Sequence, residues 1–296
     1  MNFTEPVFRP PTEANSIIVR GTQSCTYNKC NFCYMSQGFT FQAASLEHME
    51  SEILGWKNRM PPSSRIFMVG SNPFTLSFKS LTEYIELLRT HFPHFLELSM
   101  HSRISDVAQK TDDDLKKLGH LGLKHLYVGT ENGNDEALQA MNKGQTAAEA
   151  AVQLHRLTTA GIEFTTQYII GMAGRTKGRE SGIATAKFIN EVCPRRVMPT
   201  GLTVFPGTKL AEMVREGEFI EATEKEKIEE MLYFFKELTA DTLFDAVHYL
   251  NPLHYRFRTA DAADKSEVIS DLEEFLAVHS EAEIEEMVGR RYMRSL

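Results

Sequence analysis

The sequence is poor in the features that mark secreted, membrane-spanning and nucleic-acid-binding proteins. It has only 4 cysteines among 296 residues, and no apolar run approaches the ~20 residues that a membrane-spanning helix requires. The first residues lack both the basic start and the apolar block of a secretion signal. Lys and Arg number 32 against 40 Asp and Glu, and the net charge of −8 disfavours a surface that neutralises nucleic-acid phosphates. We therefore expect a cytoplasmic protein whose partners include neither a membrane nor a nucleic acid.

What the sequence does have is a globular composition and a regular alternation of elements. Apolar residues make up 42% of the chain and charged residues 24%, which excludes wholesale disorder. Short apolar runs predict strands at 16–21, 65–70, 95–100, 123–129, 164–171 and 196–205. Segments of helical periodicity predict helices near 41–59, 79–91, 112–121, 134–160 and 176–191. Strands and helices that alternate in this way indicate parallel βαβ units.

Six such units fit an α/β fold in which the strands form an open, partial TIM-type (β/α)6 barrel. A doubly wound sheet has the same alternation, and the spacing alone does not choose between the two. The pattern changes after residue 208, because residues 223–246 predict one long amphipathic helix, with further helices up to Leu296. We therefore expect a barrel over residues 1–222 and a helical C-terminal extension over residues 223–296 that packs on the barrel.

Three of the four cysteines lie within nine residues, directly after the first predicted strand: Cys25, Cys30 and Cys33. Sites in parallel barrels lie at the C-terminal ends of the strands, so this loop is a candidate metal site. Three thiolates suit zinc or an iron–sulfur cluster. A structural zinc site needs a fourth ligand, and the nearest candidate, His48, falls on a predicted helix. Chance clustering of buried cysteines is the third interpretation. The remaining Cys193 has no companion and is expected to be a buried thiol.

The cysteine trio, with Phe32 directly before its last member, resembles the radical S-adenosylmethionine (SAM) superfamily, in its coproporphyrinogen-oxidase-like and Elp3-like branch. Further segments resemble the strand ends of that family in the right order: Gly129-Thr-Glu-Asn-Gly133, Tyr168-Ile-Ile-Gly-Met172 and Val204-Phe-Pro-Gly-Thr208. Two departures stand out. Four residues instead of the usual three separate the first two cysteines, and Gly70-Ser71-Asn72-Pro73 replaces the usual Gly-Gly-Glu. The resemblance extends over about residues 16–217.

The resemblance implies a [4Fe-4S] cluster on the three cysteines, with one iron left free to chelate SAM. Electron transfer from the reduced cluster would cleave SAM to a 5′-deoxyadenosyl radical that takes hydrogen from an unidentified small-molecule substrate. The electron donor would be a protein such as flavodoxin or ferredoxin. The alternative is a delivery factor that binds the cluster and SAM without turnover, as haem-chaperone-like relatives do. A zinc-stabilised barrel without redox chemistry is the third possibility.

The same resemblance assigns cofactor contacts along the strand ends. Phe32 would lie against the adenine, and Ser71 or Asn72 would accept a hydrogen bond from the cofactor's amino group. Arg103 would pair with the methionyl carboxylate or an anionic substrate, and Glu131 would bond the ribose hydroxyls or the methionyl part. Gln167 would face the cofactor, and Val204 would offer backbone groups to adenine.

Each assigned residue also has a purely structural interpretation. Phe32 would be a core aromatic side chain, Arg103 a solvated loop residue, Glu131 a helix cap and Gln167 part of a buried polar layer. The C-terminal loop residues His248, Tyr249 and His254 either line a substrate entrance or simply pack.

Overall fold

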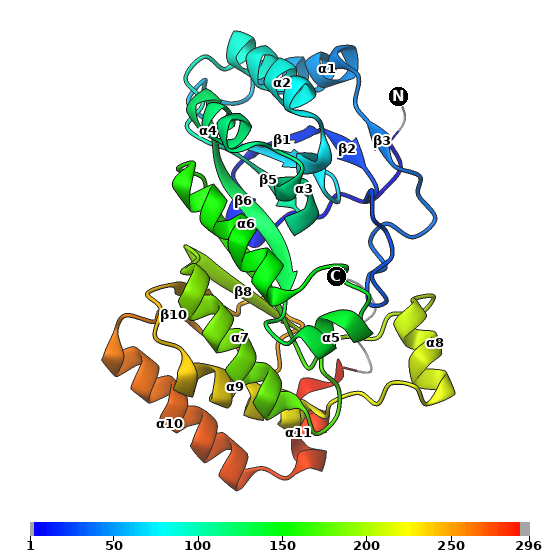
Figure 1. Cartoon of the computed structure of the whole chain (residues 1–296), viewed down its shortest axis with the longest axis vertical. Helices are drawn as coiled ribbons and strands as arrows, with labels where there is room; N and C mark the ends of the chain where they lie inside the picture. Colours follow the sequence, from blue (N-terminus) through cyan, green and yellow to red (C-terminus); the bar gives the residue numbers. More distant parts are fainter. Residues whose placement is uncertain (1–2, 291–296) are drawn as a thin grey trace. The chain divides into compact units, whose positions relative to one another are not determined.

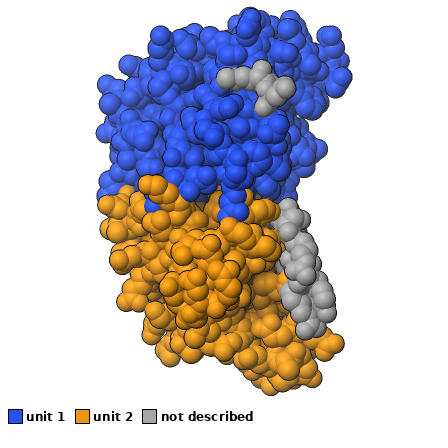
Figure 2. Space-filling model, turned by 90° about the vertical axis from the view of Figure 1, so that its right-hand side faces the viewer, with its two compact units in different colours: residues 1–28, 35–129, 152–164 blue, residues 29–34, 130–151, 165–296 orange. Residues whose placement is uncertain are grey.

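The computed structural model describes residues 3–290, and the chain divides into two compact units (Figure 2). Unit 1 comprises residues 1–28, 35–129 and 152–164, and unit 2 comprises residues 29–34, 130–151 and 165–296.

Unit 1 is built on parallel strands, as the alternation of elements predicts. β1 (Ile17–Arg20), β4 (Ile66–Val69), β5 (Leu98–Ser102) and β6 (Leu123–Glu131) pair in this order, and β6 continues into unit 2 with its last two residues. All four side chains of β4 are buried, which is typical of a parallel strand with both faces covered. A separate short sheet joins β2 (Thr22–Gln23) and β3 (Gln42–Ala43).

The helices of unit 1 lie before and between its strands along the chain (Figure 1). They are η1 (Pro11–Glu13), α1 (Leu46–Lys57), η2 (Pro73–Thr75), α2 (Phe78–His91), α3 (Ile104–Ala108) and α4 (Asp112–Leu121). α1 begins five residues later than expected, because Ser45 caps it by accepting from the His48 backbone N–H at 3.1 Å.

Unit 2 continues the parallel pattern with β7 (Glu163–Ile170), β8 (Arg196–Gly201) and β9 (Leu243–Asp245), and β10 (Arg256–Arg258) pairs antiparallel to β9. The strand order of the large sheet is β1-β4-β5-β6-β7-β8-β9-β10. The predicted α/β fold with a mostly parallel sheet is thereby confirmed.

The helices of unit 2 are α5 (Asp135–Ala140), α7 (Gly178–Val192), α8 (Lys209–Glu216), α9 (Glu224–Glu237), α10 (Ala262–Val278) and α11 (Glu281–Val288), with α6 (Ala147–Thr159) shared between the units. α7, α9 and α10 lie side by side (Figure 1). The buried rings of Phe234, Phe235 and Phe244 join α9 to β9, with ring centroids 4.6–5.7 Å apart.

Further expected boundaries are wrong, and the strand expected over 196–205 ends at Gly201. The helix expected over 134–160 is two helices, because Asn142 and Gly144 have positive φ angles of 50° and 72° and end the first one. The helix expected over 223–246 stops at Glu237, and residues 243–245 form β9 instead, because their backbone pairs with β8. The strand expected over 95–100 covers Leu98–Ser102.

The C-terminal extension therefore contains strands as well as helices. Its expected last helices are α10 and α11, and the part of that expectation at 291–296 lies outside the described residues. The division of the chain at residue 222 stays a prediction. No helix within residues 3–290 is long and apolar enough to cross a bilayer.

Candidate active site

The cysteine loop is anchored separately at its two ends. On the side of unit 1, the Thr26 backbone N–H next to Cys25 donates to Asn72 Oδ1 at 3.3 Å. On the side of unit 2, the Asn31 backbone N–H donates to the Met141 carbonyl at 3.0 Å, and the Leu210 N–H donates to the Asn31 carbonyl at 2.8 Å. The backbone around the trio is thus held by hydrogen bonds in both units.

The cysteines themselves are chemically suited to ligate a metal cluster. Cys25, Cys30 and Cys33 form no disulfide and are partly exposed, and the Cys33 N–H donates to the Cys30 carbonyl at 3.2 Å in a tight turn. Within residues 3–290, no group of three or more His, Cys, Asp or Glu side chains is gathered as for a metal ion. Because Cys25 belongs to unit 1 and the other two to unit 2, the ligand set stays a prediction.

Phe32 packs beside an apolar cluster of unit 2 that includes Leu138, Met141 and Ile169. The surroundings of Phe32 therefore fit its structural interpretation as a core aromatic side chain. Its contact with adenine stays a prediction. Val204 packs against the same cluster and lines a cavity.

The replacement of the family's Gly-Gly-Glu does not leave this region without carboxylates. Asn72 is fully buried and its Nδ2 donates to both oxygens of Asp106, at 3.1 and 3.3 Å. Ser71 donates to Glu5 Oε1 at 2.8 Å, and Glu5 is also buried. Burial raises the pKa of Asp106, which favours its neutral form. Sequence reasoning missed Asp106 and Glu5, because they come from distant segments and no local motif marks them.

Arg103 is not a solvated loop residue, so that structural interpretation is wrong. It is 6% exposed, and its guanidinium carbon lies 3.9 Å from the centroid of the Tyr27 ring. Its backbone N–H donates to Asp106 Oδ2 at 2.9 Å. The geometry brings Arg103, Asp106 and Asn72 together in unit 1. Arg103 also contacts Tyr27, which follows the first cysteine, Cys25, by two residues in the sequence.

Glu131 does not cap the helix that follows it, so the capping interpretation is also wrong. Asn134 caps α5 by accepting from the Ala137 N–H at 3.0 Å. The Glu131 carboxylate instead pairs with Lys143 Nζ at 3.0 Å, with both side chains less than a tenth exposed. Glu131 also has a φ of +68°, a strained conformation for a residue with a side chain, and such strain is concentrated at functional sites.

Gly133, near Glu131, and Gly171, at the end of β7, lie so close to neighbouring helices that a side chain would not fit. A Cβ on Gly133 would lie 2.5 Å from the Ala184 carbonyl of α7. Gly171 has a φ of +84°, and a Cβ there would lie 2.9 Å from Lys227. The glycines that carry the resemblance thus allow the strand-end loops to pack against α7 and α9.

The remaining candidates are placed as follows. The Gln167 side chain is partly exposed, and its carbonyl accepts from Thr130 Oγ1 at 2.8 Å, so it is not part of a fully buried layer. His248 and Tyr249 stack with ring centroids 4.9 Å apart, and burial lowers the pKa of His248, with His254 adding to the shift. Their role at a substrate entrance stays a prediction.

Cys193 is exposed, so its predicted burial is wrong. Cys193 is the C-cap residue of α7 and has the left-handed conformation, with a φ of 45°. At this helix end its side chain is in contact with solvent.

A buried carboxylate ties the end of β7 to α9. Glu230 accepts from Tyr168 Oη at 2.6 Å, Ser181 Oγ at 2.8 Å and the Gly171 N–H at 2.8 Å. Burial raises the pKa of Glu230 to about 7, although these three donors act in the opposite direction. Through Tyr168 and Gly171, this network fixes the Tyr168–Met172 segment to α9.

The raised pKa of Glu230 predicts a pH dependence of stability. Its pKa is higher in the folded than in the unfolded chain, so its contribution is complete at about pH 4 and is lost as the pH rises through about 7. We expect this group to lower the free energy of unfolding by about 3 kcal/mol between those values. Chemical denaturation across this range, compared with Glu230→Gln, measures the difference in slope. Equal slopes for the two proteins would contradict the assignment.

The parallel strands and their helices define an α/β protein with the architecture of a TIM-type partial barrel, and comparisons with known proteins agree. Residues 19–182, more than half of the chain, match the radical SAM superfamily. The chain therefore belongs to the radical SAM superfamily, whose members are enzymes that use a [4Fe-4S] cluster and SAM.

The chain is similar to curated and solved members of that family. The tRNA-2-methylthio-N(6)-dimethylallyladenosine synthase of Geotalea uraniireducens is 26% identical over 209 residues, 68% of this chain and 46% of that protein. Coproporphyrinogen III oxidase (HemN) from Escherichia coli has a TM-score of 0.51 at 20% identity, over 67% of this chain and 46% of that one. Elp3 from Methanocaldococcus infernus has a TM-score of 0.54 at 14% identity, over 88% and 63%.

At sequence identities of 14% and 20%, the similarity to these solved structures establishes the fold alone. The partial-barrel architecture is thus confirmed by two members of the branch that the sequence resembles. The chain spans less than half the length of the curated relatives that it matches.

Proposed function

We propose that this chain carries the catalytic centre of a radical SAM enzyme that acts on a small molecule. The observation that carries the proposal is the trio Cys25, Cys30 and Cys33 in the loop after β1, inside the segment that matches the superfamily. None of the three cysteines is in a disulfide and all are partly exposed, as ligands of an iron–sulfur cluster need to be before the cluster is inserted. When bound, the reduced cluster would cleave SAM and the resulting 5′-deoxyadenosyl radical would take hydrogen from the substrate.

The residues of the chain would bind and orient SAM. Arg103, held over Tyr27, offers a guanidinium to the methionyl carboxylate, and the Asp106–Asn72 pair offers a hydrogen-bonding surface to the amino group. Glu131, fixed by Lys143, offers its carboxylate to the ribose hydroxyls. The apolar cluster beside Phe32 and Val204 would receive the adenine and exclude water from it.

The proposal includes two partners and a location. The cluster needs an electron donor, for which a flavodoxin or a ferredoxin is suited, and the substrate is a small molecule. The cytoplasm provides the conditions that keep the three thiols reduced.

Anaerobic reconstitution with iron and sulfide, followed by SAM and dithionite, tests the function. We expect a brown protein that converts SAM to 5′-deoxyadenosine. A protein that binds the cluster and SAM but forms no 5′-deoxyadenosine would be a delivery factor instead. A colourless protein that holds zinc and takes up no iron would contradict both.

A further inference from the structure

Unit 2 contains a cavity of about 460 Å³ at the loops that follow β7 and β8. Arg175 comes from the loop after β7, Thr203 and Val204 from the loop after β8, and Lys227 from α9. A cavity of this size is in the range of small-molecule sites. Its lining is mostly charged, so its charges decide what it can bind.

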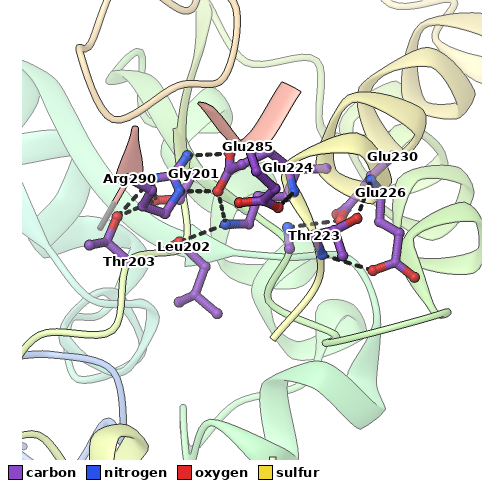
Figure 3. Close-up of polar contacts among 11 residues, drawn as sticks. Gly201, Leu202, Thr203, Thr223, Glu224, Glu226, Glu230, Glu285 and Arg290 are labelled. Atoms are coloured by element: carbon purple, nitrogen blue, oxygen red, sulfur yellow. Dashed lines mark hydrogen bonds and ion pairs between the residues drawn. The ribbon is translucent and has the colours of Figure 1, made fainter. Parts of the chain in front are cut away.

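Most of the buried charges of the cavity are neutralised within the protein (Figure 3). Lys227 Nζ donates to Glu224 Oε1 at 2.7 Å and to the Leu202 carbonyl at 3.1 Å. Arg290 Nη2 donates to Glu224 Oε2 at 2.8 Å, and its Nη1 donates to Thr203 Oγ1 at 2.8 Å. Burial opposes ionisation of Glu224, but the hydrogen bond from Arg290 and the charge of Lys227 outweigh it and hold its pKa below the usual range. The side chains of Lys227 and Arg290 thus both pair with that of Glu224 on one side of the cavity.

Three charged side chains of the lining are left over: Glu221, which is half-buried, and Arg175 and Glu281, which are exposed. Within residues 3–290, the side chains of Arg175, Glu221 and Glu281 have no hydrogen bond and no ion pair. The Arg175 backbone N–H donates to the Ile220 carbonyl at 2.9 Å, which places Arg175 next to the residue that precedes Glu221. Burial raises the pKa of Glu221, and Lys227 and Arg290 only partly oppose this. A half-buried carboxylate of this kind gains from a cation, and Arg175 gains from an anion.

We propose that this cavity binds a small zwitterion as the substrate, with its ammonium group on Glu221 and its carboxylate on Arg175. The inference rests on the proposed function and deepens it, because it names the class of substrate. Thr203 and Val204 line the same cavity, so the zwitterion lies beside the β8 loop to which we assign the adenine of SAM. One ligand with both charges pairs with Arg175 and with the half-buried Glu221, whereas an amine or a carboxylate alone pairs with only one of them.

The test uses the reconstituted holoenzyme with SAM bound and measures dissociation constants by anaerobic calorimetry. The probes are glycine, β-alanine, γ-aminobutyrate, δ-aminovalerate, L-lysine and L-tryptophan, with alkylamines and alkyl carboxylates of the same lengths beside them. We expect at least one zwitterion to bind more tightly than its amine and its carboxylate. Arg175→Gln and Glu221→Gln are each expected to weaken this binding by roughly ten- to a hundredfold, because each removes one charge-assisted hydrogen bond. Arg215→Gln on α8, outside the cavity, is the control and should bind as the wild type does.

Each outcome decides one question. A holoenzyme that forms 5′-deoxyadenosine but binds no probe, or binds it equally well after both substitutions, overturns the zwitterion site and leaves the proposed function in place. A loss of SAM affinity in step with the loss of probe affinity assigns the cavity to the cofactor and also overturns the site. A wild type that binds zwitterions but never forms 5′-deoxyadenosine retires the proposed function instead.

Discussion

Replacing Cys25, Cys30 or Cys33 by Ala is expected to abolish the iron–sulfur cluster, with the iron content of each anaerobically reconstituted variant falling to background. Three thiolates are the fewest that hold a four-iron cluster while leaving one iron open to SAM. The loss of any one of them therefore removes the site instead of weakening it. Iron and sulfide analysis, together with the visible absorption of each variant, measures the effect.

Cys193→Ala is the matched control, because Cys193 is the fourth cysteine of the chain and lies at the end of α7. It is expected to keep the full iron content and the rate of SAM cleavage. If Cys193→Ala loses its iron, or if one of the trio can be removed without loss, the ligand set proposed here is wrong.

Removing the carboxylate of Glu131 is expected to lower both stability and SAM affinity. Glu131→Ala removes the buried ion pair with Lys143, and breaking a buried ion pair costs about 3–5 kcal/mol of unfolding free energy. If the carboxylate also bonds the cofactor, the dissociation constant of SAM rises roughly ten- to a hundredfold. Chemical denaturation and SAM titration of the reconstituted protein measure the two effects separately.

A double variant separates the two roles of Glu131. Glu131→Met combined with Lys143→Met replaces the pair by apolar side chains, and such replacements are often neutral in stability. We expect the double variant to unfold near the wild-type denaturant concentration and yet to bind SAM weakly. A double variant with wild-type SAM affinity would reduce Glu131 to a structural residue, and a Glu131→Ala protein of unchanged stability would show that the ion pair contributes nothing.

The parts of the fold that follow from local pattern were predictable from the sequence. The strand-end motifs around Gly133 and Gly171 mark positions where only glycine fits against a neighbouring helix, so the sequence itself records the packing. Continuous apolar runs such as Ile66–Val69 likewise report strands buried on both faces.

What could not be predicted depends on partners that are remote in sequence. Asp106 and Glu5 meet Asn72 and Ser71 only through the fold, so the sequence motif at 70–73 gives no sign of the carboxylates beside it. Residues 243–245 have helical periodicity in the sequence, but backbone pairing with β8 makes them a strand. The break at Asn142 and Gly144 inside an otherwise helical stretch was missed because single residues in the left-handed region leave the apolar period almost unchanged.

The pairing of β9 with β8 also limits how this protein can be divided or recombined. A chain cut at residue 222 would leave the backbone groups of β8 without their neighbour at Arg196 and Val197, as an open edge that invites intermolecular pairing and aggregation. Exchange of the C-terminal segment between relatives therefore has to supply a matching edge strand as well as the helices. In protein engineering, a boundary at the start of α9 therefore separates β9 from the strand with which it pairs.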